Sequence, residues 1–243
     1  MRKPVLLLFA AALLCGTAAP AFADLAAGKR AYAKKDYKRA FPELSAEAKR
    51  GRPEAMYLLG KMYAEGQGTA QDDAQAFNWF QKAADANNAP AQGMLGMFYA
   101  QGRGATRDNA KSVEWARRAA DNGDALSQYM MGMRSLDGLG MPRDPDGAFT
   151  WFGSAAEQNY ALAQYSLGVL MGFGPKAQGD TAGAHELRTE AAKWLMLAVR
   201  QKSPDVPAGP AKLDELKKRM APKEIGEAEL RVRRWRPTLA KKS

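Results

Sequence analysis

The sequence has little of the residue types on which covalent and metal chemistry depend. Among its 243 residues, Cys15 is the only cysteine and His185 the only histidine. A disulfide needs two cysteines, and a thiolate zinc site needs several metal ligands, so these residues can form neither. A catalytic serine needs a base held close by, and no such pairing is evident. We therefore expect no metal, no cofactor and no catalytic residue, with His185 as a surface residue beside Glu186.

Long apolar segments are also scarce. A helix needs roughly 20 apolar residues to cross a bilayer, and the run from Val5 to Leu14 has ten. Two basic residues precede this run, and residues 21–23 read Ala-Phe-Ala, with small residues where a signal peptidase reads. Residues 1–23 are therefore predicted to be a secretory signal, cut between Ala23 and Asp24, that sends the chain to the periplasm or outside the cell. A membrane anchor and a lipoprotein are the alternatives.

Charge is unevenly spread along the chain. The sequence carries 36 lysines and arginines against 26 aspartates and glutamates, a formal net charge of +10. Residues 24–52 hold nine basic and four acidic residues, residues 53–210 hold 14 and 17, and residues 211–243 hold 11 and five. Both ends of the mature chain are therefore basic. Solvated helix faces explain such ends, and an anion-binding role is the alternative.

Glycine, aspartate and tryptophan recur with a period of 36 residues, which is typical of a repeat protein. The residues in these series are Gly60, Gly96, Gly132 and Gly168; Gly66, Gly102, Gly138 and Gly174; Asp72, Asp108, Asp144 and Asp180; and Trp79, Trp115 and Trp151. The next tryptophan, Trp194, comes 43 residues later. The seven added residues make nearly two helical turns, so they lengthen a helix without rotating its buried face.

Each period predicts two antiparallel helices. In the first helix, apolar residues fall three and four apart from Ala55 to Tyr63, and Gly66 ends the helix because glycine suits the left-handed residue after a C-terminus. Asp72 then stands where the N-cap of a second helix belongs. Gly60 lets the two helices approach, and Trp79 is expected to fill the space beside it. Stacked pairs bury both faces, which predicts an all-α, right-handed superhelical solenoid.

The pattern resembles the Sel-one-like repeat family, a branch of the tetratricopeptide-like helical repeats. The family motif is roughly Ala-x3-Leu-Gly-x2-Tyr-x2-Gly-x-Gly-x3-Asp-x2-Lys-Ala-x2-Trp-x3-Ala-Ala. Residues 55–84 and 91–120 match it, and residues 127–156 and 163–199 match it more loosely. What the resemblance implies is an adaptor that holds other proteins and catalyses no reaction.

Period and resemblance together divide the chain. After the predicted signal at 1–23, residues 24–52 are interpreted as a degenerate first repeat. Four repeats are expected within 53–203, at about 54–89, 90–125, 126–161 and 162–203. A capping helix pair is predicted at 204–237, since similar C-terminal helices close many chains of this family, and a tail follows at 238–243.

Two repeats depart from the pattern. In the third, Arg134 stands where the other repeats have Met, Phe or Leu, and a buried cation needs a partner. Arg134 is expected to reach solvent or to pair with Asp137, and the alternative is an open array in which it faces a partner protein. In the fourth repeat, Pro175 and Lys176 change the loop. That loop is predicted to have a different shape.

In the resembling superfamily the first helix of each pair lines the concave surface, which implies a groove for a partner peptide or protein. Aromatic and methionine side chains suit adaptable contacts of this kind. The predicted partner-binding residues are Tyr57, Lys61, Met97, Tyr129, Met133, Tyr165, Val169 and Phe173. The alternative is that these residues only pack between repeats.

Three functional hypotheses follow. The first is a periplasmic scaffold that binds one or more envelope proteins, without nucleic acid and without spanning the membrane. The second is a binder of an anionic envelope surface or polymer through a basic patch of Lys217, Lys218, Arg219, Arg231, Arg233, Arg234 and Arg236. The third is a hydrolase, against which the cysteine-free mature sequence argues, because the family members linked to such activity are cysteine-rich.

Overall fold

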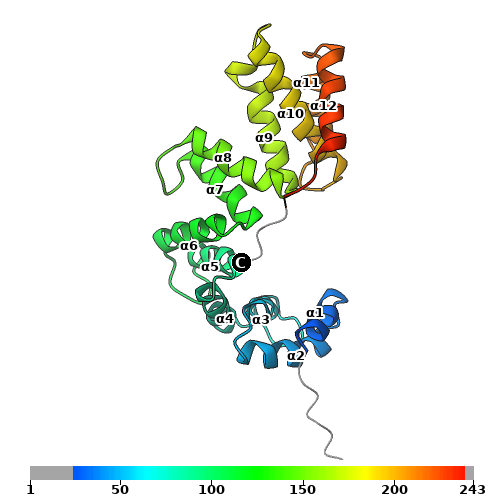
Figure 1. Ribbon diagram of the computed structural model, residues 1–243. Coiled ribbons are helices and arrows are strands. Elements are labelled where there is room, and N and C mark those ends of the chain that lie inside the picture. The colour runs from blue at the N-terminus through cyan, green and yellow to red at the C-terminus, as the bar shows by residue number, and fades with distance from the viewer. Residues whose placement is uncertain (1–23, 239–243) are drawn as a thin grey trace, which may run out of the picture.

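The computed structural model describes residues 24–238 and is all-α over that range (Figure 1). The predicted signal peptide, residues 1–23, lies outside the described residues. Within them, twelve α-helices follow one another in consecutive antiparallel pairs, which confirms the predicted solenoid of helix pairs. None of the helices in residues 24–238 combines the length and the apolar character that crossing a membrane requires.

The helices have regular lengths, and those from α3 to α9 span 13 residues each. Their bounds are α1 Leu25–Ala33, α2 Tyr37–Lys49, α3 Pro53–Glu65, α4 Asp73–Asp85, α5 Ala89–Gln101, α6 Asn109–Asp121, α7 Ala125–Asp137, α8 Pro145–Glu157, α9 Ala161–Phe173, α10 Ala182–Arg200, α11 Gly209–Lys217 and α12 Pro222–Arg234. A short 3₁₀ helix, η1, spans Pro175–Ala177. The extra residues of the fourth repeat lie in η1, its flanking turns and the longer α10.

The pairs stack along a curve that is open on one side (Figure 1). The first helices α3 and α5 lie on the inner side of this curve, and the second helices α4 and α6 lie on the outer side (Figure 1). From α1 to α10, each helix packs against its neighbours in sequence, and α11 and α12 both pack against α10. The first helices α3 and α5 are therefore elements that present residues to the inner side.

Aspartate side chains begin the second helices, as predicted. The carboxylates of Asp72, Asp108 and Asp144 each accept a hydrogen bond at 2.9 Å from the backbone N–H three residues further on. The fourth aspartate, Asp180, does not do so, and the Thr181 hydroxyl caps α10 at 3.1 Å instead. The 36-residue series therefore misplaced the fourth cap by one residue, because the altered loop before it changes the register.

A phenylalanine, not the repeated tryptophan, fills the space beside Gly60 and Gly132 of the first glycine series. A Cβ on Gly60 would lie 2.7 Å from the ring of Phe80, and one on Gly132 would lie 2.7 Å from the ring of Phe152. Both rings are fully buried, whereas Trp79 is half-buried. The prediction for Trp79 was wrong by one residue, which corresponds to about 100° around a helix.

Glutamine side chains connect successive pairs in the interior. A buried glutamine recurs near the start of three first helices. Its side-chain amide donates to a backbone carbonyl of the preceding helix. Its side-chain carbonyl accepts from a carboxamide in the turn after the second helix of the same repeat. These contacts are Gln92 to Ala84 at 3.1 Å and Asn122 to Gln92 at 2.8 Å; Gln128 to Ala120 at 3.0 Å and Gln158 to Gln128 at 2.7 Å; and Gln164 to Ala156 at 3.2 Å and Gln201 to Gln164 at 2.7 Å. The buried polar atoms thus have the partners that burial demands.

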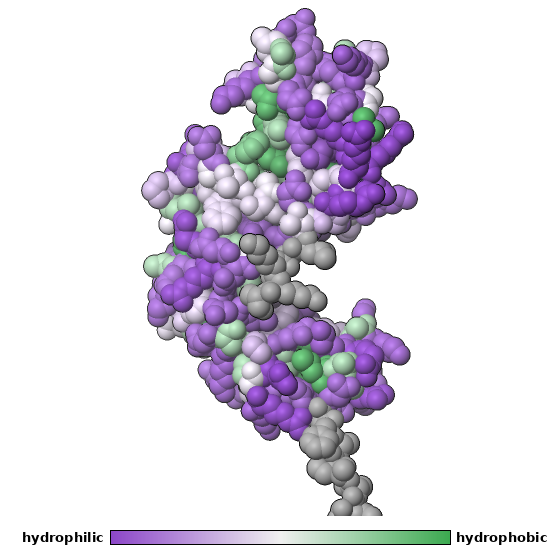
Figure 2. Space-filling view, viewed as in Figure 1, coloured by the Kyte–Doolittle hydropathy of each residue, from purple (hydrophilic) through white to green (hydrophobic). Residues whose placement is uncertain are grey.

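The fourth loop differs from the others, as predicted. In the second repeat, Gly104 lies so close to the preceding pair that a Cβ would come 2.2 Å from the Asp73 carbonyl oxygen. Lysine at the corresponding position, Lys176, cannot make this approach, and the chain forms η1 there. Phe149 of α8 is left 42% exposed, and Figure 2 shows an apolar patch over the junction of α8 and α9.

Candidate binding surface

Two of the predicted groove tyrosines pack mainly within their own part of the array. The ring centroid of Tyr57 lies 6.1 Å from that of Phe80. The Tyr129 ring lies 5.6 Å from Phe152 and 5.4 Å from Tyr160. Burial raises the pKa of the Tyr57 hydroxyl above its ordinary value. These half-buried rings support the helix pair and leave only part of their surface for a partner.

The last three predicted groove residues are half-buried and pack against the C-terminal helices. Tyr165, Val169 and Phe173 of α9 pack against a cluster that includes Leu213 and Leu216 of α11. The Nζ atom of Lys212, also in α11, lies 4.5 Å from the centroid of the Phe173 ring. The C-terminal helices therefore occupy part of this face of α9, and the assignment of these three residues to the groove stays a prediction.

The open apolar surface lies on α5 and α7. Leu126 is 42% exposed and Met133 is 37% exposed, and Met130 stands between them in sequence and is half-buried. These three residues are spaced by four and three, so they share one face of α7. Met94 and Met97 hold the same positions in α5 and are half-buried. We call these five residues the methionine face; the sequence prediction included only Met97 and Met133.

Lys61 marks the N-terminal end of this surface. Lys61 holds the position in α3 that Met97 and Met133 hold in α5 and α7. Its Nζ atom lies 5.7 Å from the ring centroid of Tyr32 in α1. The groove position in α3 that corresponds to Met97 and Met133 is thus cationic and already contacts an aromatic ring.

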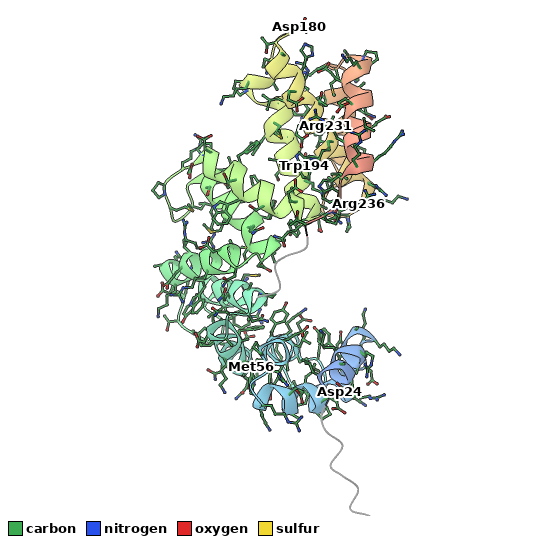
Figure 3. The ribbon with its side chains drawn as sticks, in the orientation of Figure 1. Asp24, Met56, Asp180, Trp194, Arg231 and Arg236 are labelled. Atoms are coloured by element: carbon green, nitrogen blue, oxygen red, sulfur yellow. The ribbon has the colours of Figure 1, made fainter. Side chains whose placement is uncertain are left out.

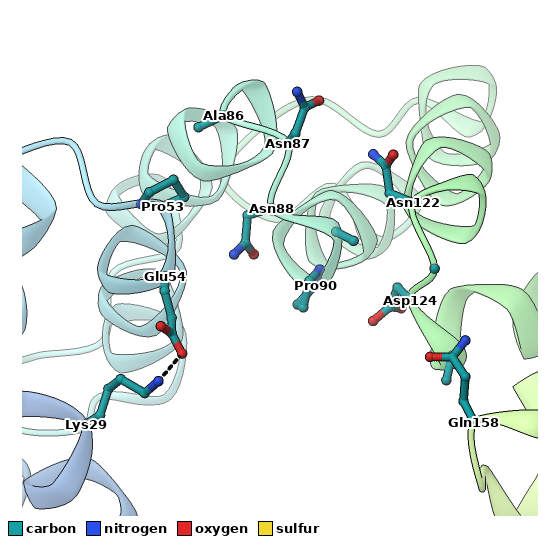
Figure 4. Close-up of a pocket in the computed structure, with 13 residues that line it drawn as sticks. Lys29, Pro53, Glu54, Ala86, Asn87, Asn88, Pro90, Asn122, Asp124 and Gln158 are labelled. Carbon is teal, nitrogen blue, oxygen red and sulfur yellow. Dashed lines mark ion pairs between the residues drawn. The ribbon is translucent and has the colours of Figure 1, made fainter. Parts of the chain in front are cut away.

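A polar hollow of about 640 Å³ adjoins the N-terminal ends of α3, α5 and α7 (Figure 4). Three repeats contribute to it, and carboxamide side chains predominate among its polar groups. The lining includes Lys29, Glu54, Asn87, Asn88, Asn122, Asp124 and Gln158. Lys29 and Glu54 form an ion pair at 2.5 Å, drawn as the dashed line in Figure 4.

The polar side chains of this hollow are held in place by the backbone. The Asn88 side-chain oxygen accepts from the N–H of Ala91 at 3.0 Å, and the Asp124 carboxylate accepts from that of Ser127 at 2.8 Å, so both are N-caps. Asn122 is fixed by the hydrogen bond that its side chain donates to the buried Gln92. The remaining amide and carboxylate groups suit the N–H and C=O groups of an extended peptide.

One member of the predicted basic patch is not free. Arg231, labelled in Figure 3, pairs with both oxygens of Glu186 at 2.6 and 3.0 Å. It also reaches Glu190 at 3.0 Å and Glu227 at 3.2 Å. The hydrogen bonds that Arg231 donates, first of all those to Glu186, raise its pKa. Arg231 therefore connects α10 with α12 and is removed from the predicted patch.

The other members of the patch remain at the surface. Lys218, Arg219, Arg233, Arg234 and Arg236 are exposed, and Lys217 is half-buried. Strongly hydrophilic residues cover the visible side of α12 in Figure 2. The C-terminal end of the array is thus a cationic surface without Arg231.

Arg134 has a partner that the sequence did not suggest. Its Nη2 atom donates to the buried Ser112 hydroxyl at 3.2 Å, so the expected pairing with Asp137 was wrong. Burial lowers the pKa of Arg134, because a desolvated cation is disfavoured. Arg134 therefore contacts the preceding helix pair, and its side chain is half-buried.

His185 is part of an ion cluster at the far end of the array. Its Nε2 atom lies 2.7 Å from Asp180 and its Nδ1 atom lies 3.1 Å from Glu224 of α12. Arg188 is buried beside them and donates to the carbonyls of Ala177 and Gly179. The half-buried histidine thus helps to fix the fourth loop against α12, and the expectation of a plain surface residue was incomplete. No group suited to hold a metal is found among residues 24–238.

These features define a class of protein: a helical repeat array whose pairs stack into a curved scaffold. The Sel1 repeat model matches residues 53–88, 89–124, 125–160 and 161–202, which together make up more than half of the sequence. The chain therefore belongs to the Sel1 repeat family. Repeats of this family form helical scaffolds that commonly bind proteins and are typically non-catalytic.

Two solved structures are similar to the chain. A Sel1 repeat protein from Oxalobacter formigenes is 33% identical with a TM-score of 0.67, over 74% of this chain and 49% of that one. The c5321 protein, a protective antigen present in uropathogenic Escherichia coli strains and displaying an SLR fold, is 25% identical with a TM-score of 0.62, over 84% and 43%. The chain thus spans about half the length of these two structures. No curated protein matches the sequence.

Proposed function

We propose that this chain is a non-catalytic periplasmic scaffold that holds a partner protein on the inner side of its helical array. The observation that carries the proposal is the methionine face. Two of its residues, Leu126 and Met133, are among the large apolar side chains that the described part of the chain leaves exposed. Membership of a family whose repeats commonly bind proteins supports the same conclusion.

The methionine face suits a helix or an apolar peptide segment. Methionine side chains are flexible and polarizable, so they adapt to the shape of an incoming apolar surface. The carboxamide-lined hollow adjoins the same helices α5 and α7 and offers hydrogen bonds to a peptide backbone. An apolar segment on the face and an extended segment in the hollow therefore form one continuous mode of binding.

Export of the chain is part of the proposal. The basic start, the ten-residue apolar run and the Ala-Phe-Ala sequence at 21–23 support it. An envelope protein is then the expected partner, and nucleic acid is not. Fractionation of cells that express the chain, followed by N-terminal sequencing, should yield a periplasmic protein that begins at Asp24. A protein that starts at Met1 in the cytoplasm would contradict the proposed location.

The scaffold function can be tested with paired double variants. Leu126→Ser with Met133→Ser removes apolar surface from the methionine face. Leu139→Ser with Phe149→Ser is the control, because these residues are 62% and 42% exposed but lie outside the first helices. In capture from envelope extract, the first variant should lose its partner and the control should retain it. Equal retention by both variants would remove the methionine face as the binding site.

Binding of an anionic surface or polymer is the alternative function, favoured by the exposed arginines around α12. Such binding should weaken strongly between about 50 and 300 mM salt, because exposed charges are screened over roughly 10 Å at 0.1 M. Variants of the methionine face should leave it unchanged. Catalysis is the third hypothesis, and turnover of a defined substrate that is lost on changing His185 would support it.

A further inference from the structure

A second hollow, of about 680 Å³, lies at the C-terminal end of the array and is lined mainly by cations and amides. It is bounded by the turn before α9, the end of α10 and the segment after α12. The residues that line it are Asn159, Leu197, Arg200, Gln201, Arg233, Trp235, Arg236 and Pro237. We call this hollow the arginine pocket; it is separate from the methionine face.

The segment after α12 is held firmly enough to form a wall. The indole Nε1 of Trp235 donates to a carboxylate oxygen of Glu157 at 3.2 Å, and the backbone N–H of Thr238 donates to the Glu157 carbonyl at 2.7 Å. The Trp235 ring packs edge-on against the buried Trp194 at 6.1 Å. Arg236, which belongs to this segment, is labelled in Figure 3 at the end of the upper helices that faces the N-terminal pairs. The wall therefore rests on contacts between residues far apart in sequence.

The three arginines of the pocket lack acidic partners among residues 24–238. Arg200, Arg233 and Arg236 are exposed and form no ion pair there, and Arg236 donates only to two backbone carbonyls. Arg231, on the same helix as Arg233, contacts three carboxylates. Among residues 24–238 no carboxylate lines the pocket, and the nearby Glu157 already accepts the Trp235 indole N–H. The pocket thus carries uncompensated positive charge.

The amides distinguish between possible anions. Gln201 uses both hydrogens of its Nε2, on Asn159 at 3.1 Å and on Gln164 at 2.7 Å, which leaves its carbonyl oxygen as an acceptor. The Asn159 oxygen accepts from Gln164 and Gln201, which leaves its N–H₂ group as a donor. An acceptor and a donor side by side complement a peptide bond, whereas a phosphate has acceptors alone and would meet the Gln201 oxygen unfavourably.

We propose that the arginine pocket binds an acidic peptide segment of a partner protein. Guanidinium groups bind carboxylates through charge-assisted, often bidentate hydrogen bonds. In this arrangement Arg200, Arg233 and Arg236 receive aspartate or glutamate side chains, and Asn159 and Gln201 receive the backbone between them. The proposal adds a second contact site to the scaffold and does not depend on the methionine face.

The test uses the mature chain and a fluorescent polyglutamate peptide at about 150 mM salt, where the screening length is about 8 Å. Arg200→Gln with Arg233→Gln removes two charges from the pocket. Arg39→Gln with Arg117→Gln is the matched control, since it removes two exposed arginines elsewhere and changes net charge equally. The pocket variant should raise Kd about tenfold or more, which corresponds to about 1.4 kcal/mol. The control should change Kd less than about twofold.

Two results would overturn the proposal. If both double variants weaken peptide binding equally, only overall charge is being measured. If vesicles of phosphatidylglycerol bind in a manner that depends on Arg200 and Arg233 while the peptide does not, the ligand is an anionic surface. Neither result bears on the methionine face, because the Leu126 and Met133 variants retain all three pocket arginines. Thermal unfolding followed by circular dichroism checks that each variant remains folded.

Discussion

Gln128 and Gln158 join two successive repeats through their side chains: the Gln158 amide donates to the Gln128 carbonyl at 2.7 Å. Gln128, which is buried, in turn donates to the backbone carbonyl of Ala120 at 3.0 Å. The first full repeat has Met56 at the corresponding position, so the series of amides begins one repeat later. These contacts give the stack a polar connection in addition to its apolar packing.

Replacement of Gln128 by methionine, the residue at position 56, should destabilise the array by about 0.5–1.5 kcal/mol for each hydrogen bond lost. Methionine fills a similar volume but removes the side-chain bonds to Ala120 and Gln158, while the Ala120 carbonyl still accepts from the backbone N–H of Gly123 at 3.0 Å. Unfolding in urea measures the change. Gln158→Ala is the control and should cost less, because Gln158 is half-buried and its loss leaves the Gln128 bond to Ala120 intact. Equal stability of Gln128→Met and the native chain would contradict this role.

Gly60 and Gly226 should respond to alanine with opposite signs. A Cβ at Gly60 would lie 2.7 Å from the Phe80 ring, so Gly60→Ala should cost about 1–3 kcal/mol through overpacking. Nothing lies within 4 Å of a Cβ at Gly226, and alanine there should stabilise α12 by about 0.5–1 kcal/mol. Urea denaturation of the two variants measures both effects. A stabilising Gly60→Ala would show that the helices of this pair are not in close contact.

Arg134→Met should not lower the free energy of unfolding. We expect that free energy to stay the same or to rise by about 1 kcal/mol or more. Methionine occupies this position in the first full repeat, as Met62, where it is fully buried. The substitution removes a desolvated cation whose described side-chain partner is the Ser112 hydroxyl. Thermal unfolding measures the result. A clear loss of stability would mean that the bond between Arg134 and Ser112 outweighs the cost of burying the charge.

The ion pair between Asp73 and Arg103 should make part of the stability depend on pH. Arg103 hydrogen-bonds Asp73 and lowers its pKa below the ordinary 3.8. The contribution is therefore complete above pH 3.8 and is lost as the pH falls through the folded pKa. Asp73→Asn should cost no more than about 1 kcal/mol at neutral pH, because the pair is partly exposed. The gap between the two proteins should close in acid, and a gap that widens in acid would contradict the assignment.

The regular part of the fold could be predicted because it depends on local rules. A 36-residue period, cap residues such as Asp72 and terminal glycines such as Gly66 each act within a few residues of chain. The same rules do not fix how far a helix is rotated about its axis, and the prediction failed where that rotation matters. Trp79 and Phe80 are neighbours, yet only Phe80 meets Gly60, and sequence alone does not fix that angle.

The candidate sites were harder to predict because they depend on distant parts of the chain. The partial burial of Phe173, for example, depends on α11, a helix outside its own repeat. Leu126 was not predicted because the residues of α7 that face the groove were chosen by their spacing from Tyr129. The arginine pocket depends on the contact between Trp235 and Glu157, which are 78 residues apart and outside any shared repeat.

The most direct test of the scaffold function is site-specific photo-crosslinking in the cell envelope. A benzophenone amino acid is placed at Met133 on the methionine face, and in a second protein at Arg117, an exposed position on the outer helix α6. The account predicts a discrete crosslinked partner from position 133 and none from position 117. Crosslinking of the same partner only from position 117, or equally from both positions, would contradict binding on the inner side of the array.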